Sequence, residues 1–368
     1  MLRRETDGQE MMDMLLGEKE EEEVLQRFQL DSGRSEEMIF NQAIEKVERI
    51  SSRFKEVRVK TQDLRVKLDG FGVPVIECAV TDEEYYFSPW AFTQMADKIG
   101  MGAAQYLKKC LKQKENDLVP LNMNRWIGKN GDKDLLLRIY DNNQVKGVLS
   151  SRYAIFNHDD VLNSMKDVLY DGQNRGYQLE SFSATPDNMQ LRLVDPEQVI
   201  IQRERPGGTD RSTAGMIVKN GQTGMSSISI EFMVFTFACT NGLIVADDHG
   251  VAYRRKHYAV GRERFIEEVI QTFGRFPDYV EAAREDIERA RSTRLDIEKR
   301  VELFDLIKKE LRCGNEMVDK IKNIMDSRWD RTAWGLPGAI TEVAQELSSE
   351  RQYQFENFAG NLMQRLTV

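Results

Sequence analysis

The strongest candidate for chemistry is a basic run between residues 251 and 264. It contains five cations and one carboxylate, with two tyrosines among them: Tyr253, Arg254, Arg255, Lys256, Tyr258, Arg262, Glu263 and Arg264. Basic side chains contact phosphates and aromatic rings stack on bases, so this mixture is typical of proteins that bind single-stranded nucleic acid. Arg152 and Tyr153, with Arg203 and Arg205, could extend the surface. The alternative is that these cations are solvated or pair with glutamates of the C-terminal region, and the sequence leaves both open.

Residues that could bind a metal are few. The chain has three histidines and contains no motif of a phosphate-binding loop, a zinc protease or a serine hydrolase. Cys239, His249 and His257 could bind zinc, but their spacing matches no standard site and a fourth ligand is missing.

Two acidic pairs offer a second kind of chemistry. Asp159-Asp160 and Asp247-Asp248 could hold magnesium for a nuclease, because carboxylates suit hard cations. Both pairs also stand where helix caps and turns favour aspartate. We therefore expect no catalytic residue, no metal and no cofactor, and we keep a metal-dependent nuclease as the third hypothesis.

Charge is distributed unevenly along the 368 residues. Residues 1–37 carry twelve acidic and five basic side chains, which accounts for most of the net charge of −9. We expect residues 1–34 to form a disordered acidic leader, with a DNA-mimicking tail as the alternative. The sequence has no signal peptide, no apolar run of membrane-spanning length and no CxxC pair among its four cysteines. We expect a cytoplasmic protein that does not contact the membrane.

The basic run follows the most strand-like segment of the chain. Ser226–Ala238 is rich in β-branched and aromatic residues, and apolar residues occupy both of its alternating sets. This pattern predicts a strand in the middle of a sheet, buried on both faces. Asn220-Gly221 and Asn241-Gly242 flank it, and we expect Asn241 and Gly242 to form a type I′-like turn. Tyr253–His257 is then a short edge strand.

A hairpin followed by a helix occurs twice, at residues 64–112 and 135–170. A helix capped by Ser35 precedes them and extends through Val57. From Arg262 onward apolar residues recur at helical spacing, in one long helix or in two that break near Gly274–Pro277. The order predicts an α+β fold with a mostly antiparallel central sheet built of β-hairpins, packed helices and a helical C-terminal third. The expected domains are the leader, an α+β core over residues 35–260, and a helical region over 261–368 that packs on the core or on a partner subunit.

Four blocks of the sequence resemble, in the right order, motifs of the family called domain of unknown function 932, found in phages, prophages and plasmids. The blocks are Phe87–Leu107, Arg138–Leu162, Phe235–Val245 followed by Arg255 and His257, and Thr332–Val343. The resemblance covers roughly residues 60–368. Two departures stand out: Gly338 replaces an asparagine of the family pattern, and Lys219–Gly224 matches the family's NSxdG block only loosely.

The resemblance implies a role in mobile-element DNA metabolism or host takeover inside the bacterial host cell, and it implies no reaction, because the family has no established activity. We expect a non-enzymatic protein that binds or anneals single-stranded DNA and could form a homo-oligomer. The expected phosphate contacts and stacking rings are Arg152, Arg254, Arg255, Lys256, Arg262, Tyr153 and Tyr253. Arg152 and Tyr153 are either such contacts or a buried anchoring pair, and Trp334 is expected to dock on the core. The second hypothesis is a protein that binds a host factor through the acidic leader.

Overall fold

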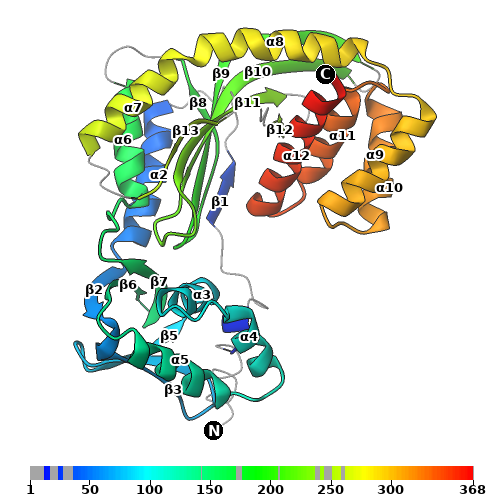
Figure 1. The fold of residues 1–368 in the computed structure, drawn as a ribbon. Coiled ribbons are helices and arrows are strands. Elements are labelled where there is room, and N and C mark those ends of the chain that lie inside the picture. The colour runs from blue at the N-terminus through cyan, green and yellow to red at the C-terminus, as the bar shows by residue number, and fades with distance from the viewer. Residues whose placement is uncertain are drawn as a thin grey trace.

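The chain forms two bodies, each built on its own β-sheet, as the computed structural model shows (Figure 1). The sheet and the helices α3–α5 of the small body come from one continuous segment, residues 54–150, inserted between two parts of the large body, and residues 12–16 also pack on its core. The structure describes residues 12–16, 24–27, 36–141, 143–170, 176–205, 208–236, 241–243, 251–257 and 262–367.

The small body has six strands in the order β2-β6-β7-β5-β4-β3. Every neighbouring pair is antiparallel except β5 and β7, which run parallel. Its strands are β2 (Phe54–Lys60), β3 (Leu64–Leu68), β4 (Pro74–Cys78), β5 (Glu83–Phe87), β6 (Asp134–Tyr140) and β7 (Gln144–Ser150). Three helices close its core: α3 (Pro89–Lys98), α4 (Ala104–Lys112) and α5 (Leu118–Lys129). Ser88 caps α3 as the sequence predicts, because its hydroxyl accepts a hydrogen bond from the Ala91 amide at 3.1 Å.

The large body has a sheet in the order β1-β8-β9-β10-β11-β12, with β13 also paired to β11. Its strands are β1 (Val24–Arg27), β8 (Gln178–Ala184), β9 (Met189–Arg205), β10 (Gly208–Asn220), β11 (Ile228–Thr236), β12 (Asn241–Leu243) and β13 (Val251–Arg255). β11 is the predicted central strand: β10 pairs with one side of it, and β12 and β13 pair with the other.

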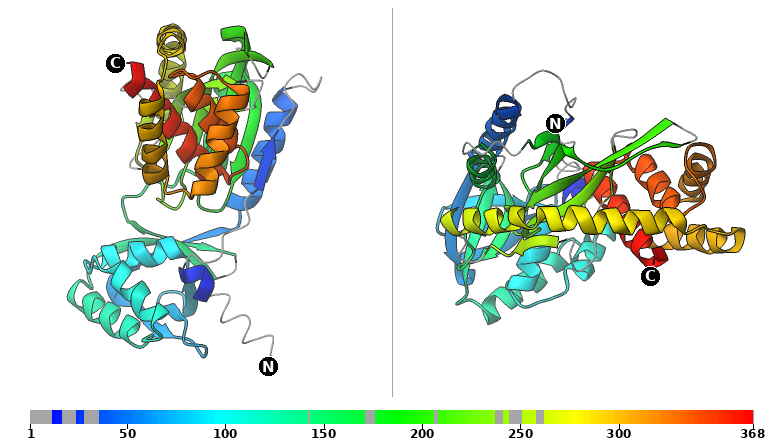
Figure 2. Two further views of the ribbon diagram at one scale, coloured as in Figure 1. Left: turned by 90° about the vertical axis from the view of Figure 1, so that its right-hand side faces the viewer. Right: turned by 90° about the horizontal axis from the view of Figure 1, so that it is seen from above.

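Helices cover both faces of this sheet. They are α2 (Glu36–Ser51), α6 (His158–Tyr170), α7 (Arg262–Gly274), α8 (Phe276–Ser292), α9 (Ile297–Glu310), α10 (Asn315–Arg328), α11 (Gly335–Ala344) and α12 (Ser349–Thr367). Figures 1 and 2 show α2, α6 and α7 on one side of the sheet, the α9–α12 lobe on the other, and α8 running between the two groups. The first face packs Ile230, Phe232 and Val234 into the main core, whereas the second packs Met233 and Phe235 near Tyr353 of α12.

The predicted α+β fold class is confirmed, with antiparallel strands distributed over two sheets that have separate cores. The C-terminal third is helical, and its first two helices break between Gly274 and Phe276, with Pro277 in the first turn of α8. No helix in the described part of the chain is long and apolar enough to cross a membrane.

One expectation needs correction. The first predicted helix ends at Ser51, because Val57 and Val59 alternate with exposed residues and pair with β6 as part of β2. The predicted disorder of the leader stays a prediction; of its described residues, Leu15, in a helical turn over residues 12–16, is buried in the small core, and Val24–Arg27 pairs with the edge of β8. The predicted domain boundary near residue 260 stays a prediction.

Candidate nucleic-acid interface

β13 lies at the edge of the large sheet. It pairs with β11, and among the described residues no second strand pairs with it. Because side chains alternate along a strand, Arg254 and Lys256 point away from the side that holds Arg255 and His257. Arg254 and Lys256 are exposed, Arg255 is largely covered and His257 is buried. One side of the segment therefore meets solvent and the other fixes it to the core.

α7 supplies the second wall of this region. Glu268 on α7 forms ion pairs with Arg255 and, at 3.1 Å, with Arg264. Four arginines and Tyr253 line one hollow here, and Glu268 is the only carboxylate among the described side chains that line it. Glu268 thus pairs with two of the four arginines, and Arg254 lies 3.7 Å from the carboxylate of Glu231, which is not part of the lining. We call its four arginines the basic edge: Arg254, Arg255, Arg264 and Arg275.

Of the other expected phosphate contacts, Arg152 lies near this edge, whereas Arg203 and Arg205 lie toward the opposite end of the sheet. The amide of Ala154 donates to the carbonyl oxygen of His257 at 2.9 Å, which places exposed Arg152 in the segment that borders the end of β13. Arg262 is the first residue of α7, and its side chain lies outside the described part of the structure. The side chains of Arg203 and Arg205, near the end of β9, also lie outside it.

The two tyrosines differ in their availability for stacking. Tyr153 is buried, its hydroxyl donates to the Gln222 carbonyl oxygen at 3.1 Å, and its ring stacks on His257 with centroids 5.0 Å apart. Of its two predicted roles, the structure supports the buried anchor. Tyr253 is half-buried against Phe265 but lines the hollow. Burial, together with the Glu268 carboxylate, raises the pKa of Tyr253.

Tyr153 belongs to a buried cluster where the two bodies meet. Arg138 on β6 of the small body is fully buried and donates to the Gln222 carbonyl oxygen of the large body at 2.7 Å. It also donates to Oδ1 of Asn157 at 2.7 Å. One carbonyl thus accepts from both Arg138 and Tyr153, which ties the turn after β10 to the small sheet. We call the following residues the junction cluster: Arg138, Tyr153, His158, Gln222 and His257.

The two histidines of the junction cluster are neutral. Nδ1 of His158 accepts from the Asn220 amide at 3.1 Å, so Nε2 carries the proton and donates to the Thr185 carbonyl oxygen at 3.2 Å. Burial lowers the pKa of His158 to about 3 and that of His257 to about 4. Both rings therefore act as uncharged structural groups at neutral pH.

Segments that resemble family motifs converge on this cluster from distant parts of the sequence. The turn at residues 221–224 needs its last glycine, because Gly224 has a φ of +76° and a Cβ there would lie 2.6 Å from the Leu149 side chain of the small body. The Gln94 side chain of α3 donates to the Thr223 carbonyl oxygen of the same turn at 3.1 Å. The matched motifs thus include the residues that join the two bodies.

The metal hypotheses gain no support from the described residues, in which no group of three or more His, Cys, Asp or Glu could hold an ion. Cys239, His249 and Asp247-Asp248 lie outside them. Asp160 accepts from the Asn157 amide at 2.8 Å, so it serves the helix-start role that the sequence also offered.

The expected structural motifs have two outcomes. Asn241 and Gly242 lie within β12, paired with Thr236 and Phe235 of β11, and not in the expected turn. Trp334 is buried against Trp329 in the α9–α12 lobe. Gly338, the departure from the family pattern, lies under the Trp329 ring: a Cβ would come within 2.6 Å of it.

Sequence reasoning missed a polar layer between the sheet and α12. Glu231 on β11 forms an ion pair with Lys219 at 2.9 Å and accepts from the Tyr353 hydroxyl at 2.7 Å. Nearby, buried Arg192 and Glu356 pair through two hydrogen bonds of 2.8 and 2.6 Å. The available signal was the presence of charged residues within otherwise apolar strands.

The comparisons with known proteins agree with the resemblance over residues 145–364, whereas the block Phe87–Leu107 lies outside the match. The family model described as Domain of unknown function (DUF932) matches residues 145–364, more than half of the chain, from β7 to α12. No curated protein and no solved structure matches the chain.

Proposed function

The chain belongs to the family described as Domain of unknown function (DUF932), and from the structure of this member we propose that it binds single-stranded DNA through the basic edge. The observation that carries the proposal is the hollow between β13 and α7, where four arginines accompany one glutamate. Guanidinium groups hold phosphates through paired charge-assisted hydrogen bonds, so a phosphate chain is the ligand that suits this surface.

The geometry favours a single strand over a duplex. Arg254 and Lys256 extend into solvent from one side of an edge strand, and Tyr253, on the other side of this strand, lines the hollow. A line of cations with an aromatic ring suits a backbone whose bases are free to stack. Because one half-buried ring remains for stacking, we expect phosphate contacts to supply most of the affinity and base preference to be weak.

The test is binding of a labelled single-stranded oligonucleotide, and of the same sequence as a duplex, measured by anisotropy across a salt series. We expect the double variant Arg254→Ala, Arg255→Ala to bind about tenfold more weakly or worse. The slope of log affinity against log salt should become shallower by about 0.7 for each phosphate that the variant no longer binds.

The matched control is Arg289→Ala on α8. The Arg289 and Arg254 side chains are each 59% exposed, and each lies within ion-pairing distance of one carboxylate. Each single variant removes one positive charge, so the two variants change the net charge equally. Equal weakening by Arg254→Ala and Arg289→Ala would mean that only net charge matters and would refute the basic edge. Cleavage with added magnesium would favour the nuclease hypothesis. Partner binding that depends on residues 1–34, with no DNA affinity, would favour the host-factor hypothesis.

A further inference from the structure

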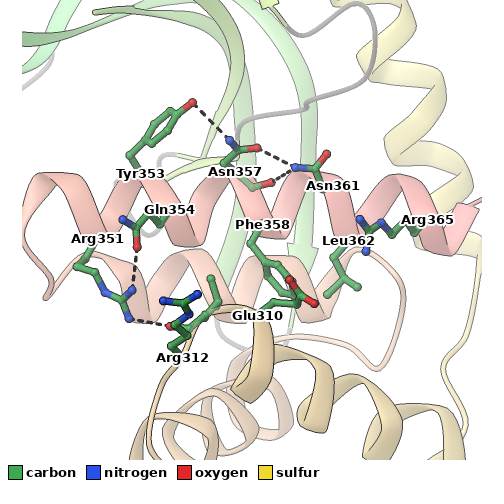
Figure 3. A pocket seen from close by; sticks show the side chains of 11 residues that line it. Glu310, Arg312, Arg351, Tyr353, Gln354, Asn357, Phe358, Asn361, Leu362 and Arg365 are labelled. Carbon is green, nitrogen blue, oxygen red and sulfur yellow. Dashed lines mark hydrogen bonds between the residues drawn. The ribbon is translucent and has the colours of Figure 1, made fainter. Parts of the chain in front are cut away.

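A second hollow lies between α12 and the end of α9 with the residues that follow it (Figure 3). Its volume of about 640 Å³ falls within the range of ligand sites in proteins. We call it the α12 hollow, and the residues of its lining that matter here are Arg312, Arg351, Asn357, Phe358, Asn361 and Arg365.

The charge of the α12 hollow is positive, since three arginines and one carboxylate, Glu310, line it. Arg351 donates to Oε1 of Gln354 at 2.8 Å and to the Leu311 carbonyl oxygen at 2.9 Å. Both acceptors are uncharged, so these bonds orient the guanidinium without neutralising it. Arg312 and Arg365 are exposed. The site is therefore suited to an anion.

The middle of the hollow is suited to a flat ring. Figure 3 shows Phe358 and Leu362 between Arg351 at one end and Arg365 at the other. Asn357 and Asn361 line the same hollow with amide groups. An aromatic face and amides between two cations match the parts of a nucleotide strand: bases with hydrogen-bonding edges, and phosphates on either side.

A ladder of hydrogen bonds joins the α12 hollow to the basic edge. Asn361 donates to Oδ1 of Asn357 at 2.8 Å, Asn357 donates to the Tyr353 hydroxyl at 3.4 Å, and Tyr353 donates to Glu231 at 2.7 Å. Arg254 lies 3.7 Å from the same Glu231 carboxylate. Glu231 is only 1% exposed, so these contacts link the two hollows through the interior of the protein and not along its surface.

We infer that the α12 hollow is a second contact for the strand that binds at the basic edge. This inference rests on the proposed function, because it assigns both hollows to one ligand. Arg351 and Arg365 are fourteen positions apart on one helix, which corresponds to about 21 Å along its axis. That span favours several nucleotides of a strand over one free nucleotide.

The experiment measures, in the full chain, how the loss of affinity caused by each arginine substitution depends on the length of the oligonucleotide. Oligothymidylates of about 4 to 16 nucleotides cover the site sizes of single-strand binders. We expect Arg254→Ala to weaken binding at every length. Arg365→Ala should weaken the longer oligonucleotides by roughly tenfold and leave the shortest unchanged, because only the longer ones reach both hollows. Arg331→Ala, a 60% exposed arginine of the same lobe outside the hollow, is the control.

The outcomes separate the two proposals. If Arg365→Ala has no effect at any length while Arg254→Ala weakens binding, the α12 contact is refuted and the proposed function stands. If neither variant changes affinity, both are refuted. Binding of AMP that Arg365→Ala abolishes, without a length effect on oligonucleotides, would replace the strand contact with a free-nucleotide site. Melting curves of each variant that match the parent chain show that the fold is kept.

Discussion

His158 and His257 connect the charge state of single residues to the stability of the fold. Their folded-state pKa values of about 3 and about 4 lie below the unfolded value of about 6.5. The unfolded chain therefore binds protons that the folded chain rejects as pH falls below about 6.5. Each histidine contributes stability that is present above that pH and is lost as pH falls toward its folded pKa.

We expect the free energy of unfolding to fall by up to about 1.4 kcal/mol per pH unit for each histidine between about pH 6 and about pH 4.5. The variant His158→Gln removes one of these groups, so its curve should be flatter in this window. Urea titrations at several pH values measure the slope. Identical slopes in parent and variant would show that His158 does not titrate between the two states.

At this scale the sequence could identify candidate residues, but it could not predict which of them would be buried and which exposed. The sequence identified Arg152-Tyr153 as a pair that could be an anchor or a contact, and the structure exposes Arg152 while it buries Tyr153. Arg152 lies in a turn that is closed by a hydrogen bond from the Tyr153 amide to the Ser150 carbonyl oxygen at 2.9 Å, so the pair divides into one exposed and one buried residue. Gly338 is explained only by the Trp329 ring above it, which the local sequence does not reveal.

At the scale of elements, α12 is attached to the sheet by a buried ion pair. Arg192 of β9 and Glu356 of α12 are 2% and 0% exposed, so neither charge can be solvated if its partner is removed. Removing one member of such a pair leaves an uncompensated charge and costs about 3–5 kcal/mol, whereas replacing both with apolar residues is often neutral.

We therefore expect Glu356→Leu to lower the free energy of unfolding by about 3–5 kcal/mol and Arg192→Met to restore most of it in the double variant. Chemical denaturation of the four chains of the double-mutant cycle measures the coupling. Faster hydrogen exchange in α12 of the single variant would locate the damage. Additive destabilisation in the double variant would show that the two side chains do not depend on each other.

Most elements could be predicted because their apolar periodicity is local. β11 carries apolar residues on both alternating sets and lies in the middle of the sheet, and the break between α7 and α8 follows from Gly274 and Pro277. The region after Ser51 was misread because Phe54 and Val57 continue the helical spacing of α2, while pairing with β6 makes them a strand. Partners such as Arg192 and Glu356, 164 positions apart, leave no local pattern.

At the scale of the whole molecule, the two bodies are joined by the junction cluster. Arg138 donates from the small sheet to the turn after β10, and Gln94 of α3 bonds the same turn. These hydrogen bonds are buried, so separating the two bodies would break them and leave their donors and acceptors without these partners. The two separate cores should therefore unfold as one cooperative unit.

We expect a single calorimetric transition for the parent chain and two for Arg138→Met, which keeps much of the side-chain bulk but removes the bonds to Gln222 and Asn157. Arg58→Met is the control. Arg58 on β2 is exposed and donates at 3.1 Å to the Ser151 carbonyl oxygen at the end of the small sheet, so this variant removes a hydrogen bond that does not involve the turn after β10. A single transition in Arg138→Met would show that the coupling resides elsewhere.

The insertion of the small body has a consequence for synthesis of the chain. Residues 54–150 contain all strands of their own sheet, so this body can be completed while the ribosome is still making the rest. α2 has already emerged by then, but α6 and β8, on which it packs, have not been made, so its apolar face is not yet covered by them. The first-made helix of the large body is thus left unpartnered during translation, and a chaperone or early collapse onto nascent neighbours would have to protect it.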